Sequence, residues 1–279
     1  MPTPPVDHPV DAVGQWVMTI VVLAALAAVA AAAYRMGRRQ RSWGPAAVLL
    51  GGLLAGFIEP IYCITMHLWY YRPGQWTMIT ALGNSQPVWS WLSYCPFYGG
   101  LTLLVWWRVS RGATRLDIAK LGGALFLIGV ATELVCIRLG TYEYYGPHPF
   151  RVAQFPLWIA VANAAVGIVG GILAAKLSPL LRGAQVWALV VLVPTTMTMV
   201  QFGTGFPTLD AINTPNPPSW LLYVLATVSM GLAATACWCA ARLLPGAVPA
   251  QPSAVTQPEP TVEAEPATLT SGDVGFARR

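Results

Sequence analysis

Two glutamates lie inside apolar stretches of this chain that are long enough to cross a membrane. They are Glu59 and Glu133, and the other acids fall in loops, at segment ends or near a terminus. An ionisable group at bilayer depth is costly unless it is neutral or paired, so it marks a functional site by default. Apolar surroundings favour the protonated form of a carboxyl group. Such a group can serve as a general acid.

One chemistry suits buried carboxylic acids that are accompanied by amides, hydroxyls and aromatic rings. Protonation of an alkene or an epoxide creates a carbocation, and the faces of aromatic rings stabilise cations through their quadrupoles. A cavity inside a membrane also excludes the water that would otherwise capture the cation early. This combination of acids, amides, hydroxyls and aromatic rings therefore favours acid-triggered cyclisation or hydration of a polyprenyl chain.

The composition places these residues in an integral membrane protein. The chain is 56% hydrophobic and only 10% charged, whereas soluble domains carry about 25% charged residues. Apolar runs of about 20 residues recur, so we predict an all-α, polytopic bundle of seven transmembrane helices. The predicted spans are residues 15–34, 44–70, 88–107, 121–139, 156–175, 185–205 and 219–241.

The lysines and arginines predict the orientation of these spans. Eleven lie between or after spans on one side of the predicted membrane, and three lie on the other. Positive residues favour the cytoplasmic side, so the N-terminus is expected outside and the C-terminus in the cytoplasm, in a multi-pass protein of the plasma membrane. The three outer residues are Arg72, Arg138 and Arg151. The net charge of +5 is thus explained by topology, and no nucleic-acid partner is expected.

The chain divides into three parts by composition. We expect a short outer arm over residues 1–14, a transmembrane domain over 15–244, and a disordered cytoplasmic tail rich in Pro, Ala, Glu and Thr over 245–279. The three outer loops are rich in aromatic residues, Gly and Pro. Such loops can fold back as lids over a cavity, or their aromatic residues can form a belt at the lipid headgroups.

Helical rise predicts that polar residues from four spans share one layer. Glu59 and Glu133 each lie roughly 20 Å from the inner surface at about 1.5 Å per residue. Asn163 on the fifth span and Gln201 on the sixth fall at the same level. This layer lies beneath the aromatic outer loops, which predicts a polar site in the outer half of the bilayer.

Each acid and amide in this layer also has a structural interpretation. Glu133 can form an ion pair with Arg138 or Arg151 that locks two helices together. Glu59 can be a neutral acid that is hydrogen-bonded to a neighbouring helix. Asn163 can simply join two helices.

Three further polar residues carry the same ambiguity. His67 is expected at the membrane interface, and His148 is expected to be solvated in a Pro-rich loop. Asp210 can cap a loop as an Asx turn. A functional site is favoured because polar residues from four spans meet in one layer, and not because of any single residue.

Several chemistries have no motif in the sequence. There is no lysine at mid-membrane depth for a retinal Schiff base, and no Asp-rich motif to hold magnesium and a pyrophosphate. There is also no cluster of histidines for zinc or haem, and no GxSxG nucleophile motif. No metal or other cofactor is therefore expected.

A family resemblance lies in the stretch ATELVCIRLGTYEYYG and the following FPLWIAVANA. A span glutamate, a Gly-x-Tyr-x-Tyr segment and a span led by Pro-Leu occur in this order, which is similar to membrane carotenoid-modifying proteins of the carotenoid hydratase and small lycopene cyclase type. The segment after the glutamate is shorter here and lacks a Gly-Phe run. The matching positions are Glu133, Gly140, Tyr142, Tyr144, Pro156 and Leu157.

A seven-span chain with a glutamate in its second span also resembles the integral-membrane terpene cyclases of meroterpenoid pathways. This resemblance implies that Glu59 protonates the substrate. Those cyclases carry a second carboxylate in span 7, where this chain has none, and Asp210 in the preceding loop is the nearest substitute. Glu133 is then expected to be a second acid, or the base that ends the reaction.

Together these features predict a terpenoid cyclase that acts on a lipophilic isoprenoid within membrane lipids. Glu59, Glu133 and Asp210 are the expected catalytic residues. The expected substrate-binding residues are Tyr62, His67, Trp69, Tyr142, Tyr144, Trp158, Asn163 and Gln201. The alternatives are an isoprenoid hydratase, a proton- or cation-coupled transporter, and a non-catalytic partner of another membrane protein.

Overall fold

The computed structural model describes residues 2–245, so the predicted tail lies outside the described residues from position 246 onward. Within this part the chain is mostly helical. The helical segments are α1 (Ala12–Gln40), α2 (Gly44–Ala55), η1 (Gly56–Ile58), α3 (Glu59–Thr65), α4 (Val88–Tyr94), η2 (Cys95–Gly99), α5 (Gly100–Val109), α6 (Arg115–Arg138), α7 (Leu157–Leu177), η3 (Ser178–Leu180), η4 (Gly183–Val191), α8 (Leu192–Asn213) and α9 (Ser219–Ala241).

Six helical segments in the described part are long and apolar enough to cross a membrane. This confirms a mostly helical chain with the character of a membrane protein. Residues 88–107, a predicted span, are not among the six. They form α4, a single π-helical stretch at η2 and α5, because Pro96 interrupts the ladder of hydrogen bonds and the many aromatic residues lower the hydropathy. The six segments are Ala12–Gln40, Gly44–Thr65, Arg115–Arg138, Leu157–Leu180, Gly183–Asn213 and Ser219–Ala241.

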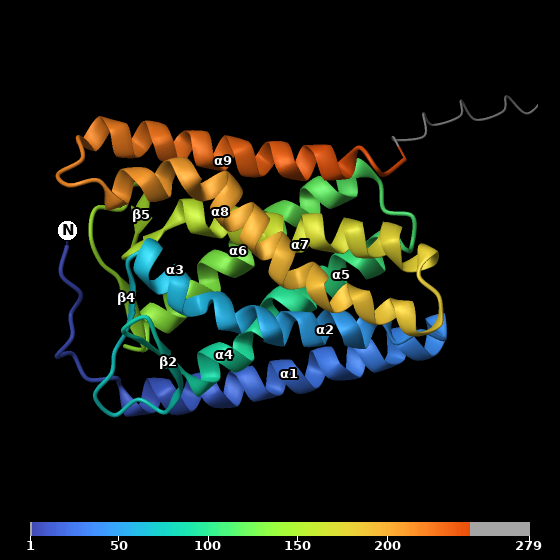
Figure 1. Ribbon diagram of the computed structural model, residues 1–279, viewed down its shortest axis with the longest axis horizontal. Coiled ribbons are helices and arrows are strands. Elements are labelled where there is room, and N and C mark those ends of the chain that lie inside the picture. The colour runs from blue at the N-terminus through green and yellow to red at the C-terminus, as the bar shows by residue number, and fades with distance from the viewer. Residues whose placement is uncertain (1, 246–279) are drawn as a thin grey trace, which may run out of the picture. The chain divides into compact units, whose positions relative to one another are not determined.

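Short antiparallel ribbons occupy the first two of the three predicted outer loops and the end of the predicted span 44–70. The all-α prediction did not include them. The labelled strands lie at the same end of the helical bundle (Figure 1). The pairs are β1 (Leu68–Tyr70) with β4 (Tyr142–Tyr144), β2 (Thr77–Ala81) with β3 (Asn84–Pro87), and β5 (Arg151–Val152) with β6 (Phe155–Pro156).

The N-terminal arm packs against this same end. The backbone N–H of Val10 donates to the carbonyl of Pro73 at 3.0 Å, and that of Asp11 donates to Gly140 at 3.1 Å. The Asp11 side chain then caps α1 by accepting from the N–H of Gly14 at 2.6 Å. Helix α1 therefore starts at a position fixed by the loops that follow the second and fourth predicted spans.

Small residues allow the helices to approach closely, as is common between membrane helices. Gly51 on α2 faces η4, where a Cβ atom would overlap the carbonyl oxygen of Val190. Gly51→Ala should therefore lower the free energy of unfolding by about 1–3 kcal/mol, because the backbone of η4 cannot move aside cheaply. The melting temperature of the purified protein in detergent measures this effect.

Gly231 on α9 provides the matched control for that substitution. An added Cβ there meets nothing within 4 Å. Alanine at this position should leave stability unchanged or raise it by up to about 1 kcal/mol, because glycine is the poorer helix former. Equal melting temperatures for the two variants would contradict close packing at Gly51.

Candidate active site

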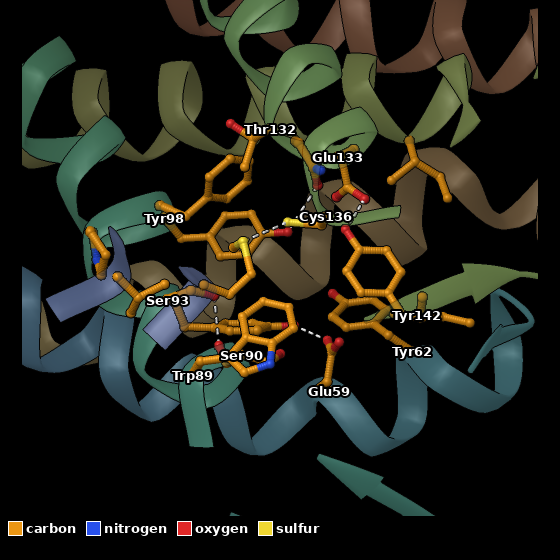
Figure 2. A pocket seen from close by; sticks show the side chains of 18 of the residues that line it. Glu59, Tyr62, Trp89, Ser90, Ser93, Tyr98, Thr132, Glu133, Cys136 and Tyr142 are labelled. Atoms are coloured by element: carbon orange, nitrogen blue, oxygen red, sulfur yellow. Dashed lines mark hydrogen bonds between the residues drawn. The ribbon is translucent and has the colours of Figure 1, made fainter. Parts of the chain in front are cut away.

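The two glutamates of the spans face one cavity of about 320 Å³. Figure 2 shows Glu59 on one wall and Glu133 on the opposite wall, with both carboxyl groups directed inward. A volume of this size lies at the lower end of the ~300–1,000 Å³ that is common for small-molecule sites. The structure therefore brings together the two acids that the sequence placed at one depth. The other predicted site residues that line the cavity are Tyr62, Tyr142, Tyr144, Asn163 and Gln201.

Glu59 is held by a tyrosine hydroxyl at each carboxyl oxygen. Tyr70 donates to Oε1 at 2.5 Å, and Tyr94 donates to Oε2. The Tyr70 hydroxyl also lies 2.7 Å from the hydroxyl of Ser90, which can donate to it. The Glu59 side chain is only 4% exposed. Two hydroxyl donors on two oxygens provide the environment that a carboxylate prefers, since an ionised carboxyl group only accepts hydrogen bonds.

Glu133 is held differently, although it also has two tyrosine partners. Tyr142 donates to Oε2 at 2.6 Å, and Tyr144 donates to the same oxygen at 3.2 Å. Both donors therefore use one oxygen, and Oε1 is left to the cavity. A neutral acid has this pattern when Oε2 is its carbonyl oxygen, which has two lone pairs, and Oε1 carries the proton.

The β1–β4 ribbon sets three of the four tyrosine contacts in register, and the fourth, from Tyr94, comes from α4. Tyr70 pairs directly with Tyr142, and their rings lie 5.3 Å apart, edge to face. Successive residues of a strand point to opposite faces, so Leu68 and Tyr70 line the cavity while Trp69 between them does not. Trp69 was expected to bind substrate, but it lies against the Arg72 guanidinium, 3.9 Å from the ring centre.

The tyrosines of β4 are hydroxyl donors over the whole physiological pH range. Burial raises the pKa of Tyr142 and of Tyr144 well above the usual value, and the neighbouring Glu133 raises both further. Both hydroxyls therefore keep their protons. Glu133 can change its protonation state while its two donors remain unchanged.

Irregular turns in two helices create the space around the acids. Helix α2 ends at Ala55, a 3-10 turn follows, and α3 restarts at Glu59 with Pro60 in its first turn, where proline is tolerated. The π-helical stretch η2 follows Tyr94 and includes Tyr98, and such insertions occur often at functional sites.

Aromatic faces form much of the remaining wall. The Tyr62 ring stacks on Phe202 with centroids 4.7 Å apart, which fixes its orientation beside Glu59. Trp89 lies nearly parallel to Tyr142 with centroids 6.2 Å apart. These rings provide the π surfaces that stabilise a positive charge, each by about 0.5–2 kcal/mol.

An amide and hydroxyl network closes the cavity opposite the ribbon. Tyr98 donates to Asn163 Oδ1 at 2.9 Å, and the Gln201 amide donates to the same oxygen at 2.5 Å and to the Tyr98 hydroxyl at 2.9 Å. The three residues come from η2, α7 and α8, so they join helices. They also line the cavity, and Asn163 therefore combines both roles that the sequence allowed.

The cavity reaches the outer surface of the bundle between α1 and α6. Val21 on α1 is 53% exposed and Ile128 on α6 is 50% exposed, yet both line the cavity. The two helices meet near their ends, where the Cys136 and Met18 sulfur atoms lie 3.7 Å apart. A lipophilic molecule can therefore enter sideways, from the region that lipid chains would occupy.

Asp210 lies outside the cavity, away from the two glutamates with which it was predicted to act. The sequence placed it in a loop, but α8 continues to Asn213 and carries Asp210 on an exposed face. Gln201 and Asp210 are separated by about two and a half helical turns, so they point in opposite directions. The third outer loop is accordingly shorter than expected and forms no lid over the cavity.

Three more predictions are corrected by burial and contact. His67 does not line the cavity: it is 3% exposed and bonds to Asn213 at 3.2 Å. His148 is buried rather than solvated, and its pKa is lowered well below the usual value by burial and by Arg151. Trp158 is 1% exposed and packs in the core near Gly205.

The ion pair that was considered for Glu133 is replaced by the two tyrosine contacts. The guanidinium of Arg151 donates instead to the carbonyl oxygen of Tyr144 at 2.6 Å. Arg138 is exposed near the end of α6. Arg151 thus supports the backbone of β4, whose tyrosines hold Glu133.

Several residues that surround the two glutamates were not among the predicted site residues. Tyr70 shares a helical face with Glu59 in sequence, and Tyr94 and Tyr98 follow an i, i+4 spacing on one span, a signal that could have identified them. No local pattern marks Trp89 or Ser90, because loop geometry brings them to Tyr70. The tyrosines of the third span are the most important omission.

The comparisons with known proteins add no family for this chain. No family model, no curated protein and no solved structure matches it. Among the residues that the structure describes, no group of three or more His, Cys, Asp or Glu could hold a metal ion. The chemical groups that line the cavity include the two carboxyl groups and the aromatic side chains.

Proposed function

We propose that the chain crosses the plasma membrane seven times, with its N-terminus outside and its C-terminus in the cytoplasm. The asymmetry of lysines and arginines supports this orientation. The helical stretch over residues 88–109 would be the seventh crossing. At 1.5 Å per residue it is about 33 Å long, which suffices for the ~30 Å hydrocarbon core.

We propose that the protein is an integral-membrane terpenoid cyclase that initiates reaction by protonating an isoprenoid alkene or epoxide. One observation carries this proposal: two carboxyl groups, each held by two tyrosine hydroxyls, face one aromatic cavity that opens sideways between α1 and α6. The opening suits a substrate that resides in the bilayer. The tyrosine contacts give the two acids different protonation preferences, as acid–base pairs require.

Glu133 is the general acid in this proposal. Its Oε1–H proton passes to an alkene carbon, whose π electrons form the new C–H bond and leave a cation on the adjacent, more substituted carbon. Tyr142 and Tyr144 stabilise the carboxylate that remains on Glu133, because hydrogen bonds to a charged group are the strong ones. With an epoxide the proton passes to oxygen, and the C–O bond breaks to give the same kind of cation.

Ring closure and termination complete the reaction. The π electrons of a second double bond attack the cation and form a carbon–carbon bond, which moves the positive charge along the chain. Glu59, held as a carboxylate, accepts the proton that is finally lost next to the cation, and the C–H electrons become a new double bond. The proton gained equals the proton lost, so the net reaction is an isomerisation. This order of the two glutamates is the reverse of the one implied by the family resemblance, because the hydrogen bonds leave only Glu133 with an oxygen free to donate.

Isotope incorporation tests the proposal. The protein is expressed in a host supplied with farnesyl, geranylgeranyl and longer polyprenyl precursors, and isolated membranes are then incubated in deuterated water. A new cyclic product that carries one deuterium on carbon is expected, since the proton of the acid exchanges with solvent. Unchanged lipids with every precursor, from protein shown to be folded in the membrane, would refute the cyclase.

The mass of the product separates the cyclase from the alternatives. A product heavier by one water would identify a hydratase, in which water captures the cation. Transport would instead appear as proton movement across proteoliposomes without a new product, and this movement would depend on the same two glutamates.

Tyr70→Phe tests the placement of Glu59. The substitution keeps the ring and removes the hydroxyl that donates to Oε1. Losing one hydrogen bond to a charged group should lower the initial rate about tenfold. Tyr145→Phe is the control on the neighbouring segment, because Tyr145 does not line the cavity; equal rates for both variants would contradict the role of Tyr70.

A further inference from the structure

A second cavity lies end to end with the acid cavity. It is a groove of about 730 Å³ between α1 and α5, and Pro96 and Leu101 line both spaces. One stripe of α1 also connects them: Met18, Val22 and Ala25 line the acid cavity, and the groove continues from Val29. The spacing of three and four residues keeps this stripe on a single helical face.

The groove changes character along its length. Near the shared wall it is apolar, with Val29 and Leu104. Its far end carries the side chains of Arg35, Arg39 and Arg111. Among the residues that the structure describes, none that lines the groove is acidic, so its described walls do not neutralise these three positive charges.

The distance from the arginines to the acid cavity is the same when it is counted along α1 and along the segment from η2 to the turn after α5. Val22 and Arg35 on α1 are separated by thirteen residues, and so are Tyr98 and Arg111 along η2, α5 and the following turn. At 1.5 Å per residue each separation is about 20 Å. An extended single chain can therefore reach from the arginines into the acid cavity.

We propose that the substrate is a single-chain isoprenoid with a phosphate headgroup, bound with the phosphate at Arg35, Arg39 and Arg111 and the far double bond beside Glu133. This inference rests on the proposed function and names its substrate class. Guanidinium groups bind phosphate oxygens in pairs, which lysine does less well. The headgroup is retained through the reaction, because protonation starts at the opposite end of the chain.

The positive-inside rule alone would also place arginines at this end of α1. Arg38 and Arg41 separate the two explanations. They lie at the same end of α1, but they line a different cavity, next to Trp43. This third cavity shares no lining residue with the acid cavity. A headgroup site predicts that the two sets of arginines differ, whereas a topology signal predicts that they do not.

Binding of geranylgeranyl monophosphate and of geranylgeraniol to the full-length protein in phosphatidylcholine nanodiscs tests the proposal. The wild type should bind the phosphate at least about tenfold more tightly than the alcohol. The triple variant Arg35→Gln, Arg39→Gln, Arg111→Gln should lose this preference and retain affinity for the alcohol. The double variant Arg38→Gln, Arg41→Gln should behave as the wild type.

Further variants keep the test independent of folding and of catalysis. The arginine-to-lysine triple variant preserves the charge that sets topology, and it should lose part of the phosphate preference. Glu133→Gln should bind the phosphate normally, so a failed cyclase and a failed headgroup site give different results. Equal binding of phosphate and alcohol by the wild type, or an equal effect of both glutamine sets, would overturn the headgroup site.

Discussion

Glu133→Gln is expected to abolish product formation while the protein remains folded in the membrane. Glutamine has nearly the same size and still accepts hydrogen bonds from Tyr142 and Tyr144, but its amide cannot transfer a proton to carbon. The loss should be at least about 100-fold, the lower range of general acid catalysis. Gas chromatography with mass spectrometry of the lipid extract measures the remaining product.

Glu143→Gln is the matched control for that variant. Glu143 lies between the two tyrosines on β4, points away from the cavity, and accepts a hydrogen bond from Tyr71 at 2.9 Å. It is the same type of residue and lies between the two tyrosines that hold Glu133. Its product yield should equal that of the wild type, and near-normal activity of Glu133→Gln would exclude Glu133 as the acid.

Glu59→Gln is expected to change which products form more than whether they form. Glu133 can still protonate the substrate, but the cation then lacks the carboxylate that stabilises it and removes the final proton. Formation of the wild-type cyclic product should fall by about 10²–10³-fold, the effect of losing one such electrostatic group. The cation should escape by early proton loss or by water capture, so the extract should contain partly cyclised or hydroxylated isoprenoids.

The contrast between the two variants decides the order of the roles. If Glu59→Gln removes every product and Glu133→Gln yields altered ones, Glu59 is the acid, as the resemblance to meroterpenoid cyclases implies. Asp210→Asn serves as the control here, because Asp210 is exposed on α8 and lies outside the cavity. Its products should match those of the wild type.

Sequence reasoning came close to the fold because hydropathy and helical rise are local properties. Apolar length predicted the long helical segments. Rise per residue placed Glu59, Glu133, Asn163 and Gln201 at one depth, and all four line the same cavity. Depth along a helix depends only on counting residues from its end.

The sequence pattern did not show which face of each helix points toward the inside of the bundle. Helices that are apolar on every side give no amphipathic pattern from which an inward face could be inferred. Tyr94 and Tyr98 were missed, although their i, i+4 spacing places them on one face of a predicted span. Asp210 was assigned to the site because the end of α8 was placed too early.

The sequence by itself thus indicated a mostly helical chain with the character of a membrane protein, and the two acids within its spans. Only the tertiary structure decided that one cavity holds both, and that Glu133 keeps an oxygen free while Glu59 does not. The second oxygen of Glu59 is occupied by Tyr94 from α4. The other three tyrosines come from the β1–β4 ribbon, which pairs residues more than 70 positions apart, Tyr70 and Tyr142. Long-range pairing of this kind depends on how the helices pack, and no local pattern of residues specifies it.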